Sequence, residues 1–156
     1  MTSRHEARIR AVQFLFQQDF NPGELTPALE EFWSHWKPAA SVRGFAERLI
    51  RGVLRHQETL DEELRALADN WEVRRMGGVD RNVMRVALFE LAHCEDIPPV
   101  VSVNEAVDIA KSLSSYESGW FVNGVLDRAL RKVSRPMRAA AGTSRAPGGA
   151  RRREPT

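Results

Sequence analysis

Three amphipathic segments follow one another between residues 79 and 133, and this stretch constrains the fold more than any other. In the first, Val83, Ala87, Leu88 and Leu91 recur at steps of three and four residues, the spacing of one helix face. The next two segments repeat this spacing at Ala106, Ile109, Ala110 and Leu113, and at Phe121, Val122, Val125, Leu126, Ala129 and Val133. Three apolar faces in succession predict a helical domain.

Polar residues and prolines predict where these three helices begin. Asp80 stands at an N-cap position before the first, and Ser102 with Glu105 has the spacing of a capping box before the second. Pro98-Pro99 favours an extended connector between the two. Ser118 can cap the third helix.

The first half of the chain adds further helical segments. A capping box of Ser3 and Glu6 opens a helix that is expected to run to about Asp19. Shorter patterns cover residues 26–36, starting at Thr26, and 41–67, starting at Ser41, the latter with a break near 56–59. No segment alternates with period two, so the fold class is all-α, a bundle of about six to seven helices.

The chain divides into a helical domain at residues 1–133 and a tail at 134–156. The tail contains no Leu, Ile, Val or aromatic residue and is rich in Arg, Ala and Gly, which predicts disorder. Its six arginines and one glutamate carry +5, and since the whole chain carries +2, the first 133 residues carry −3. The excess positive charge therefore says nothing about the helical domain, and nucleic-acid binding there must rest on local groups.

Composition excludes several classes of protein. No apolar run approaches the roughly 18 residues that span a bilayer, and the arginines near the start do not fit a signal peptide, so a cytoplasmic protein without membrane contact is expected. Cys94 is the only cysteine and the four histidines lack metal-ligand spacing, so neither a disulfide nor a metal site is predicted. With no nucleotide-binding loop and no catalytic constellation, we expect neither an enzyme nor a cofactor.

The first predicted helix presents arginines that can bind a polyanion. Arg4 and Arg8 lie one turn apart on the same side, whereas Arg10 points away. The helix macrodipole disfavours cations at a helix N-terminus. Arginines at this position are therefore easier to explain if they bind a phosphate group there. The alternative is that both arginines are simply solvated.

In the last helix, Asn123-Gly124 interrupts a regular apolar pattern. Glycine in mid-helix costs about 1 kcal/mol relative to alanine. The structural interpretation is that Gly124 allows a neighbouring helix to approach while Asn123 bonds across to it.

Four motifs in order resemble the NusB family of transcription antitermination factors, and the resemblance covers roughly residues 3–133. They are S-R-H-E-A-R-I-R-A-V-Q-F-L-F at 3–16, D-R-N-V-M-R-V-A-L-F-E-L at 80–91, P-P-V-V-S-V-N-E-A-V-D-I-A-K at 98–111 and F-V-N-G-V-L-D at 121–127. The resemblance implies a NusB-like helical bundle and a non-catalytic factor that binds boxA-type single-stranded RNA of nascent ribosomal transcripts.

Matching positions in the family imply where the RNA and a protein partner bind. RNA contacts are expected at Arg4, His5, Arg8, Glu117 and Phe121. Phe121 as a plain core residue remains the alternative to Phe121 as a stacking residue.

The implied partner is the small-subunit ribosomal protein that acts as NusE, docking at Phe16 and Asp80, and the complex is expected to join RNA polymerase with other Nus factors. Phe16 replaces the tyrosine usual in the family. His5 and Glu6 interrupt what is often an arginine run.

Two other functions fit the same pattern. One is a protein–protein scaffold that forms a homodimer through the first helix. The other is the NusB-like accessory domain of an RNA cytosine methyltransferase, which is disfavoured because nothing after Val133 could form a cofactor-binding domain.

Overall fold

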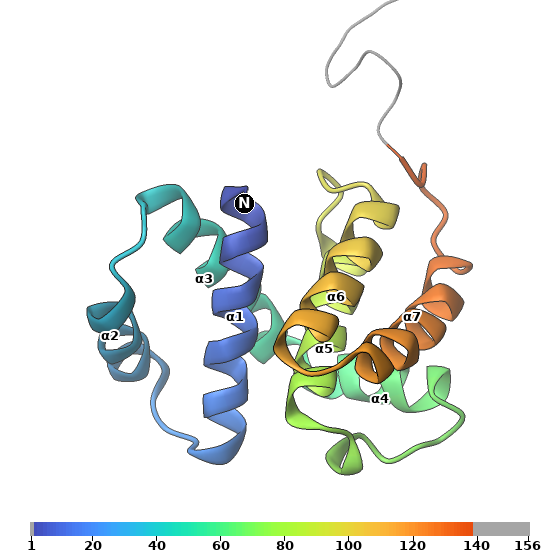
Figure 1. Cartoon of the computed structure of the whole chain (residues 1–156), viewed down its shortest axis with the longest axis horizontal. Coiled ribbons are helices and arrows are strands. Elements are labelled where there is room, and N and C mark those ends of the chain that lie inside the picture. Colours follow the sequence, from blue (N-terminus) through green and yellow to red (C-terminus); the bar gives the residue numbers. More distant parts are fainter. Residues whose placement is uncertain (1, 139–156) are drawn as a thin grey trace, which may run out of the picture.

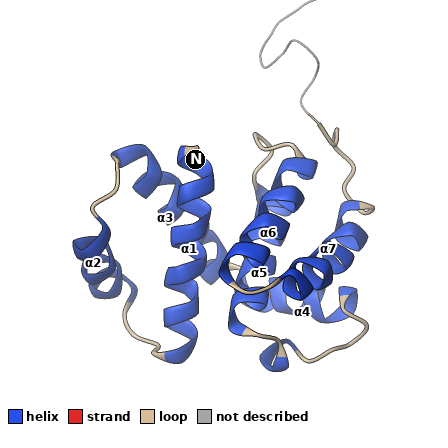
Figure 2. Ribbon diagram, in the orientation of Figure 1, coloured by secondary structure: helices blue, strands red, loops and turns tan. Residues whose placement is uncertain are grey.

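The computed structural model describes residues 2–138, and within them the chain forms α-helices, one short 3-10 helix and loops (Figure 2). The all-α prediction is confirmed. The helices are α1 (Ser3–Phe20), α2 (Leu25–Trp36), α3 (Ala40–Arg55), α4 (Gln57–Leu67), η1 (Val73–Arg75), α5 (Gly78–His93), α6 (Pro99–Leu113) and α7 (Tyr116–Leu130).

Two groups of helices pack side by side, with α1–α3 in one and α4–α7 in the other (Figure 1). Helix α1 joins them because it packs on α3 within its own group and on α5 across the boundary. Helix α5 is buried around most of its circumference, with Met84, Ala87 and Leu88 no more than 1% exposed. The motif-rich segment of the sequence therefore supplies the centre of the core.

The long helical pattern at 41–67 is divided where the sequence indicated. Helix α3 ends at Arg55 and α4 begins at Gln57, with His56 between them. Phe32 and Trp33 of α2 are buried as expected, whereas Trp36 is 42% exposed and lies under the guanidinium group of Arg10, 3.7 Å from ring centroid to carbon.

The predicted helix starts were all too late. The N-cap residues are Thr2, Glu24, Ala39, Gly77, Pro98 and Ser115. Helix α6 begins at Pro99 because proline is well tolerated at the first helical position, and this leaves Ser102 free to point into the core. Asp80 lies in the first turn of α5 and is not its cap.

The packed chain continues past the predicted boundary at Val133. The guanidinium group of Arg135 donates hydrogen bonds to the backbone carbonyls of Ile97, Glu90 and Leu91, and the Val100 amide donates to the Met137 carbonyl at 3.0 Å. The chain after α7 thus closes the connector between α5 and α6. The rest of the tail predicted to be disordered, residues 139–156, lies outside the described residues.

Helices of residues 2–138 are too short or too polar to cross a bilayer.

Candidate nucleic-acid and protein interfaces

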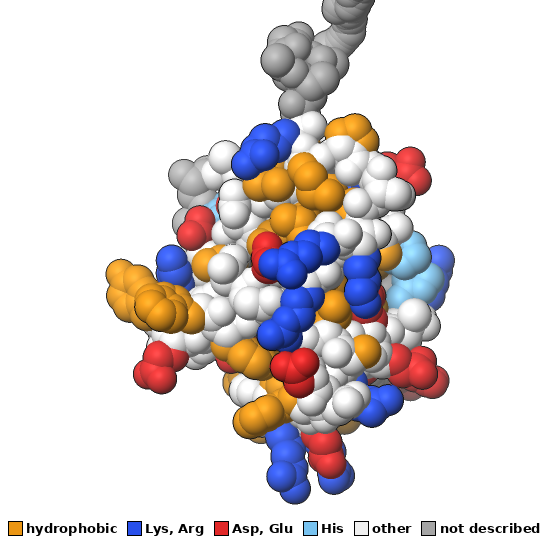
Figure 3. All heavy atoms as spheres, turned by 90° about the vertical axis from the view of Figure 1, so that its right-hand side faces the viewer, with side chains coloured by type: hydrophobic (Ala, Val, Ile, Leu, Met, Phe, Trp, Pro, Cys, Tyr) orange, Lys and Arg blue, Asp and Glu red, His pale blue; other side chains and the backbone are white. Residues whose placement is uncertain are grey.

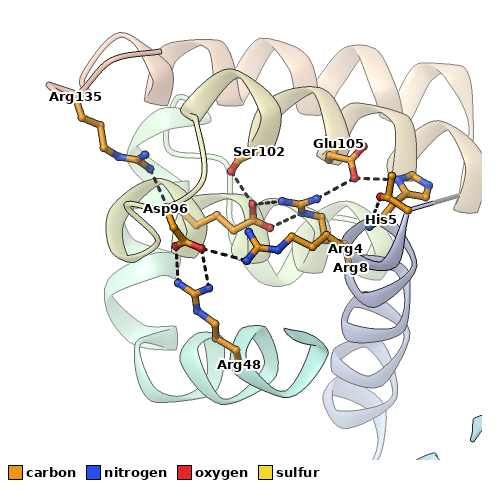
Figure 4. A network of polar contacts seen from close by, with 10 residues as sticks. Arg4, His5, Arg8, Arg48, Asp96, Ser102, Glu105 and Arg135 are labelled. Carbon is orange, nitrogen blue, oxygen red and sulfur yellow. Dashed lines mark hydrogen bonds and ion pairs between the residues drawn. The ribbon is translucent and has the colours of Figure 1, made fainter. Parts of the chain in front are cut away.

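The first turn of α1 meets α3 and the α5–α6 connector in an exposed cluster of ionised groups (Figure 4). Arg4 Nη2 lies 3.2 Å from Asp96 Oδ2. Arg48 of α3 grips the same carboxylate with both terminal nitrogens, Nη1 3.2 Å from Oδ2 and Nη2 2.8 Å from Oδ1. Hydrogen bonds from Arg48 hold the pKa of Asp96 well below its usual range, so the carboxylate is ionised at neutral pH.

Arg8 does not share the exposed position of Arg4, which corrects the prediction that both project into solvent. Its side chain is 5% exposed, with Nε 2.8 Å from Glu90 Oε2 and Nη1 3.0 Å from Glu105 Oε1. Burial alone would lower the pKa of Arg8, but the two carboxylates outweigh it and raise the pKa. Arg8 is therefore a charged residue held inside the fold.

His5 and Glu105 link this buried pair to the surface. His5 Nδ1 lies 3.0 Å from Glu105 Oε1, the oxygen that also accepts from Arg8. Both side chains are partly exposed, at 25% and 21%. His5 is therefore held at the surface, beside Arg4 in the chain, by its contact with Glu105 of α6 (Figure 4).

The ring of Phe45 in α3 contacts the guanidinium groups of three arginines, Arg4, Arg8 and Arg48, which we call the arginine cluster. The guanidinium carbons of Arg4, Arg8 and Arg48 are 4.4, 5.4 and 5.8 Å from its centroid. An aromatic face attracts guanidinium groups through its quadrupole. The ring thus supports three arginines from two helices.

The start of α7 presents a second exposed surface. Glu117 is exposed and Phe121 is 37% exposed, so Phe121 is not an ordinary core residue. Tyr116 and Trp120, which the sequence did not single out, are 76% and 77% exposed. Figure 3 shows the side of the molecule that carries α4 and α7. Hydrophobic side chains project from its left edge, and Lys and Arg side chains lie near its middle.

The expected helix approach at Gly124 is wrong. A Cβ built on Gly124 meets no atom within 4 Å, and both Gly124 and Asn123 are exposed. Both positions therefore face outward on α7, close to Phe121 along the chain.

The last turns of α1 and the start of α5 form a third region, around Phe16 and Asp80. Phe16 is half-buried and packs edge-on against Phe20, with 5.0 Å between ring centroids. A Cβ on Gly78 would lie 2.6 Å from Phe16 Cε1, so this glycine allows the close approach of the ring. Asp80 Oδ1 is buried and has no hydrogen-bond partner within residues 2–138.

Below this region, Asp19 holds α1 to α5. Its carboxylate accepts hydrogen bonds from Arg81 Nε at 3.0 Å, Asn82 Nδ2 at 2.8 Å and Arg85 Nη1 at 3.2 Å. Arg85 also grips Asp61 of α4, with Nε 2.8 Å from Oδ1. Burial alone would raise the pKa of Asp19, but these donors outweigh it and lower the pKa.

Sequence reasoning missed Arg48, Phe45 and Asp96. Arg48 and Asp96 are 48 positions apart, and each alone has the pattern of a solvated surface charge. Only the packing of α3 on α5 brings Arg48 close to the connector that carries Asp96, so no local signal could have paired them.

The described residues contain no group of three or more His, Cys, Asp or Glu side chains that could hold a metal ion. Burial raises the pKa of the Cys94 thiol to about 11, so this cysteine is an unreactive core residue.

Comparison with known proteins assigns the family. The model of the NusB family matches residues 5–131. The transcription antitermination protein NusB of Anaeromyxobacter dehalogenans is 45% identical over 130 residues, covering 82% of this chain and 91% of that protein. NusB of Syntrophus aciditrophicus is 38% identical over 133 residues, covering 85% and 83%.

Solved structures agree with this assignment. NusB of T. maritima superposes with a TM-score of 0.77 at 34% identity, covering 86% of this chain and 95% of that chain. A crystal structure of NusB and NusE in complex with double-stranded RNA matches with a TM-score of 0.76 at 25% identity, covering 84% and 98%. The prediction of a non-enzymatic protein is confirmed by these relatives, which are antitermination factors, and the chain belongs to the NusB family.

Proposed function

We propose that this protein is a non-catalytic antitermination factor that binds boxA-type single-stranded RNA together with the ribosomal protein NusE. In this role it joins RNA polymerase with other Nus factors during elongation on ribosomal RNA genes. The observation that carries the proposal is the likeness over 84% of the chain to a NusB that was solved with NusE and RNA. The exposed pair Arg4 and Arg48 and the half-buried Asp80 give that likeness a physical basis in this chain.

The proposed RNA surface combines the first turn of α1 with the start of α7. Arg4 offers an exposed guanidinium group to phosphates, and His5 lies beside it. Phe121 is exposed enough to stack on a base, and Glu117 can accept from a base amino group. Arg8 is buried and supports this surface indirectly. Its hydrogen bond to Glu105 positions the carboxylate that also contacts His5.

The proposed partner surface contains Phe16 and Asp80. Asp80 is only half-buried in the first turn of α5, so its carboxylate group can accept a hydrogen bond from a bound partner. Phe16 adds an aromatic side chain that is only half covered by its own fold. Together they offer NusE one apolar contact and one strong hydrogen-bond acceptor.

The partner surface is tested by titrating NusE into Asp80→Asn and Phe16→Ala variants that remain folded. We expect each to weaken NusE binding by about 1–3 kcal/mol, because a charged acceptor or an aromatic anchor is lost. Asp127→Asn removes an exposed carboxylate from α7 and serves as the control. Unchanged affinity in both variants would place the partner elsewhere.

The RNA surface is tested by titrating boxA and scrambled RNA in the presence of NusE. Arg4→Gln should flatten the dependence of log K on log salt by about 0.7, the value for one phosphate contact on a single strand. Phe121→Ala should lower affinity for boxA by about 1–3 kcal/mol per unstacked base. Removal of residues 139–156 should weaken binding to every RNA and leave the preference for boxA unchanged, since that segment adds charge without a base-reading pattern.

A further inference from the structure

We propose that Arg48 of α3 is a second phosphate-binding residue beside Arg4, and that Asp96 occupies in the free protein the position that an RNA phosphate takes on binding. The inference rests on the proposed RNA binding. It adds a residue from another helix and assigns the carboxylate between the two arginines the role of an internal competitor.

The geometry of the cluster matches that of a bridged anion. Arg4 Nη2 and Arg48 Nη1 both lie 3.2 Å from one oxygen, Asp96 Oδ2, while Arg48 Nη2 lies 2.8 Å from the other. A phosphodiester also presents two anionic oxygens to such a pair, and guanidinium groups bind carboxylates and phosphates with the same paired geometry. The two arginines are therefore already placed to share one phosphate.

Exposure distinguishes this ion cluster from the buried one behind it. The side chains of Arg4, Asp96 and Arg48 are 48%, 47% and 41% exposed. Exposed ion pairs contribute little to stability, so the cost of separating Arg4 and Arg48 from Asp96 is small. Arg8 and Glu90, at 5% and 1% exposure, cannot exchange partners in this way.

Phe45 keeps the two arginines in place when the carboxylate leaves. Both guanidinium groups lie over its ring, Arg4 at 4.4 Å and Arg48 at 5.8 Å from the centroid. This contact does not depend on Asp96. The pair is thus pre-positioned for an anion, which lowers the entropy lost on binding.

The first experiment measures the salt dependence of boxA RNA binding by the full chain with Arg48→Gln. We expect a severalfold loss of affinity and a slope flatter by about 0.7, as for one lost phosphate contact. Arg43→Gln is the matched control, because Arg43 lies on the same helix, is 50% exposed, and points about 140° away from Arg48. A slope unchanged in Arg48→Gln, or changed equally in Arg43→Gln, would overturn the assignment of Arg48.

Arg4→Gln, measured in parallel, separates this inference from the proposed function. If Arg4→Gln flattens the slope and Arg48→Gln does not, the RNA surface stands and the second phosphate residue is wrong. If neither variant changes the slope, the proposed RNA surface itself is wrong.

The second experiment replaces Asp96 by Asn, which keeps the shape and removes the charge. We expect boxA RNA to bind about two- to fivefold more tightly, because the arginines no longer have to leave an ionised partner. Glu72→Gln is the control, since Glu72 is 48% exposed and also pairs with two arginines, Arg74 and Arg75, in the connector before α5. Weaker or unchanged RNA binding in a folded Asp96→Asn variant would show that Asp96 does not compete with phosphate.

Discussion

The guanidinium group of Arg8 and the carboxylate of Glu90 face each other across the contact between α1 and α5. Nε lies 2.8 Å from Oε2 and Nη2 lies 2.9 Å from Oε1. Ser102 of α6 donates to the same carboxylate, with Oγ 2.6 Å from Oε1. Three helices are thus joined by one buried, fully hydrogen-bonded ion pair.

Arg8→Met should destabilise the protein by about 3–5 kcal/mol, because it leaves the charge of Glu90 buried without a partner. The double variant Arg8→Met/Glu90→Leu should recover most of that loss, since two apolar side chains of similar size then meet. Urea unfolding measures both. Arg55→Met, at an exposed position, is the control and should change the free energy of unfolding by less than about 0.5 kcal/mol. A double variant as unstable as the single one would contradict this account.

The pH dependence of stability should carry the contribution of Asp19. Its folded-state pKa is lowered from 3.8, so its contribution is complete above about pH 4 and is lost as the pH falls through the folded-state value. Asp19→Asn should reduce the free energy of unfolding at pH 7 by about 1–3 kcal/mol and flatten its fall below pH 4. Asp108→Asn, at an exposed position on α6, should keep the wild-type pH profile.

Two glycines should respond to alanine in opposite directions. Gly124→Ala should raise the free energy of unfolding by about 1 kcal/mol, because the site is helical, exposed and open. Gly78→Ala should lower it by about 1–2 kcal/mol, because the new methyl group displaces the Phe16 ring. Thermal unfolding measures both, and a gain at Gly78 would show that the ring moves aside without cost.

The boundary of the folded chain can be located by shortening it. Removal of residues 139–156 should leave the melting temperature unchanged, whereas removal of residues 135–156 should cost about 1–3 kcal/mol. The difference arises from Arg135, which caps carbonyls at the end of α5. Arg135→Ala in the full chain should reproduce most of the loss, and an unchanged stability there would contradict the capping role.

The sequence predicted the fold well because buried apolar faces are a periodic, local signal. The apolar stripes of α5, α6 and α7 are buried almost as expected, and the break at His56 was located correctly. Helix starts were less accurate, because serine and aspartate residues that can cap a helix have other uses. Ser102 binds Glu90, and Asp80 lies in the first turn of α5.

The candidate site was harder to predict because its chemistry depends on contacts between distant segments. Helical spacing placed Arg4 and Arg8 on one side of α1, but only the packing of α5 and α6 decides that Arg8 is buried and Arg4 is not. The same applies to Asp96 in the α5–α6 connector. Its proposed role depends on the ion pair with Arg48 of α3, which the sequence alone does not show.

Helix α1 carries one proposed surface at each end, with Arg4 in its first turn and Phe16 in its last turns. Phe16 follows Arg4 by twelve positions, which correspond to about 18 Å of helix. Buried ion pairs clamp this helix to α5 near both ends, through Arg8 and Asp19. The helix therefore keeps the two proposed surfaces at a fixed distance, so we expect RNA bound at one end and NusE bound at the other to stay equally far apart in every complex.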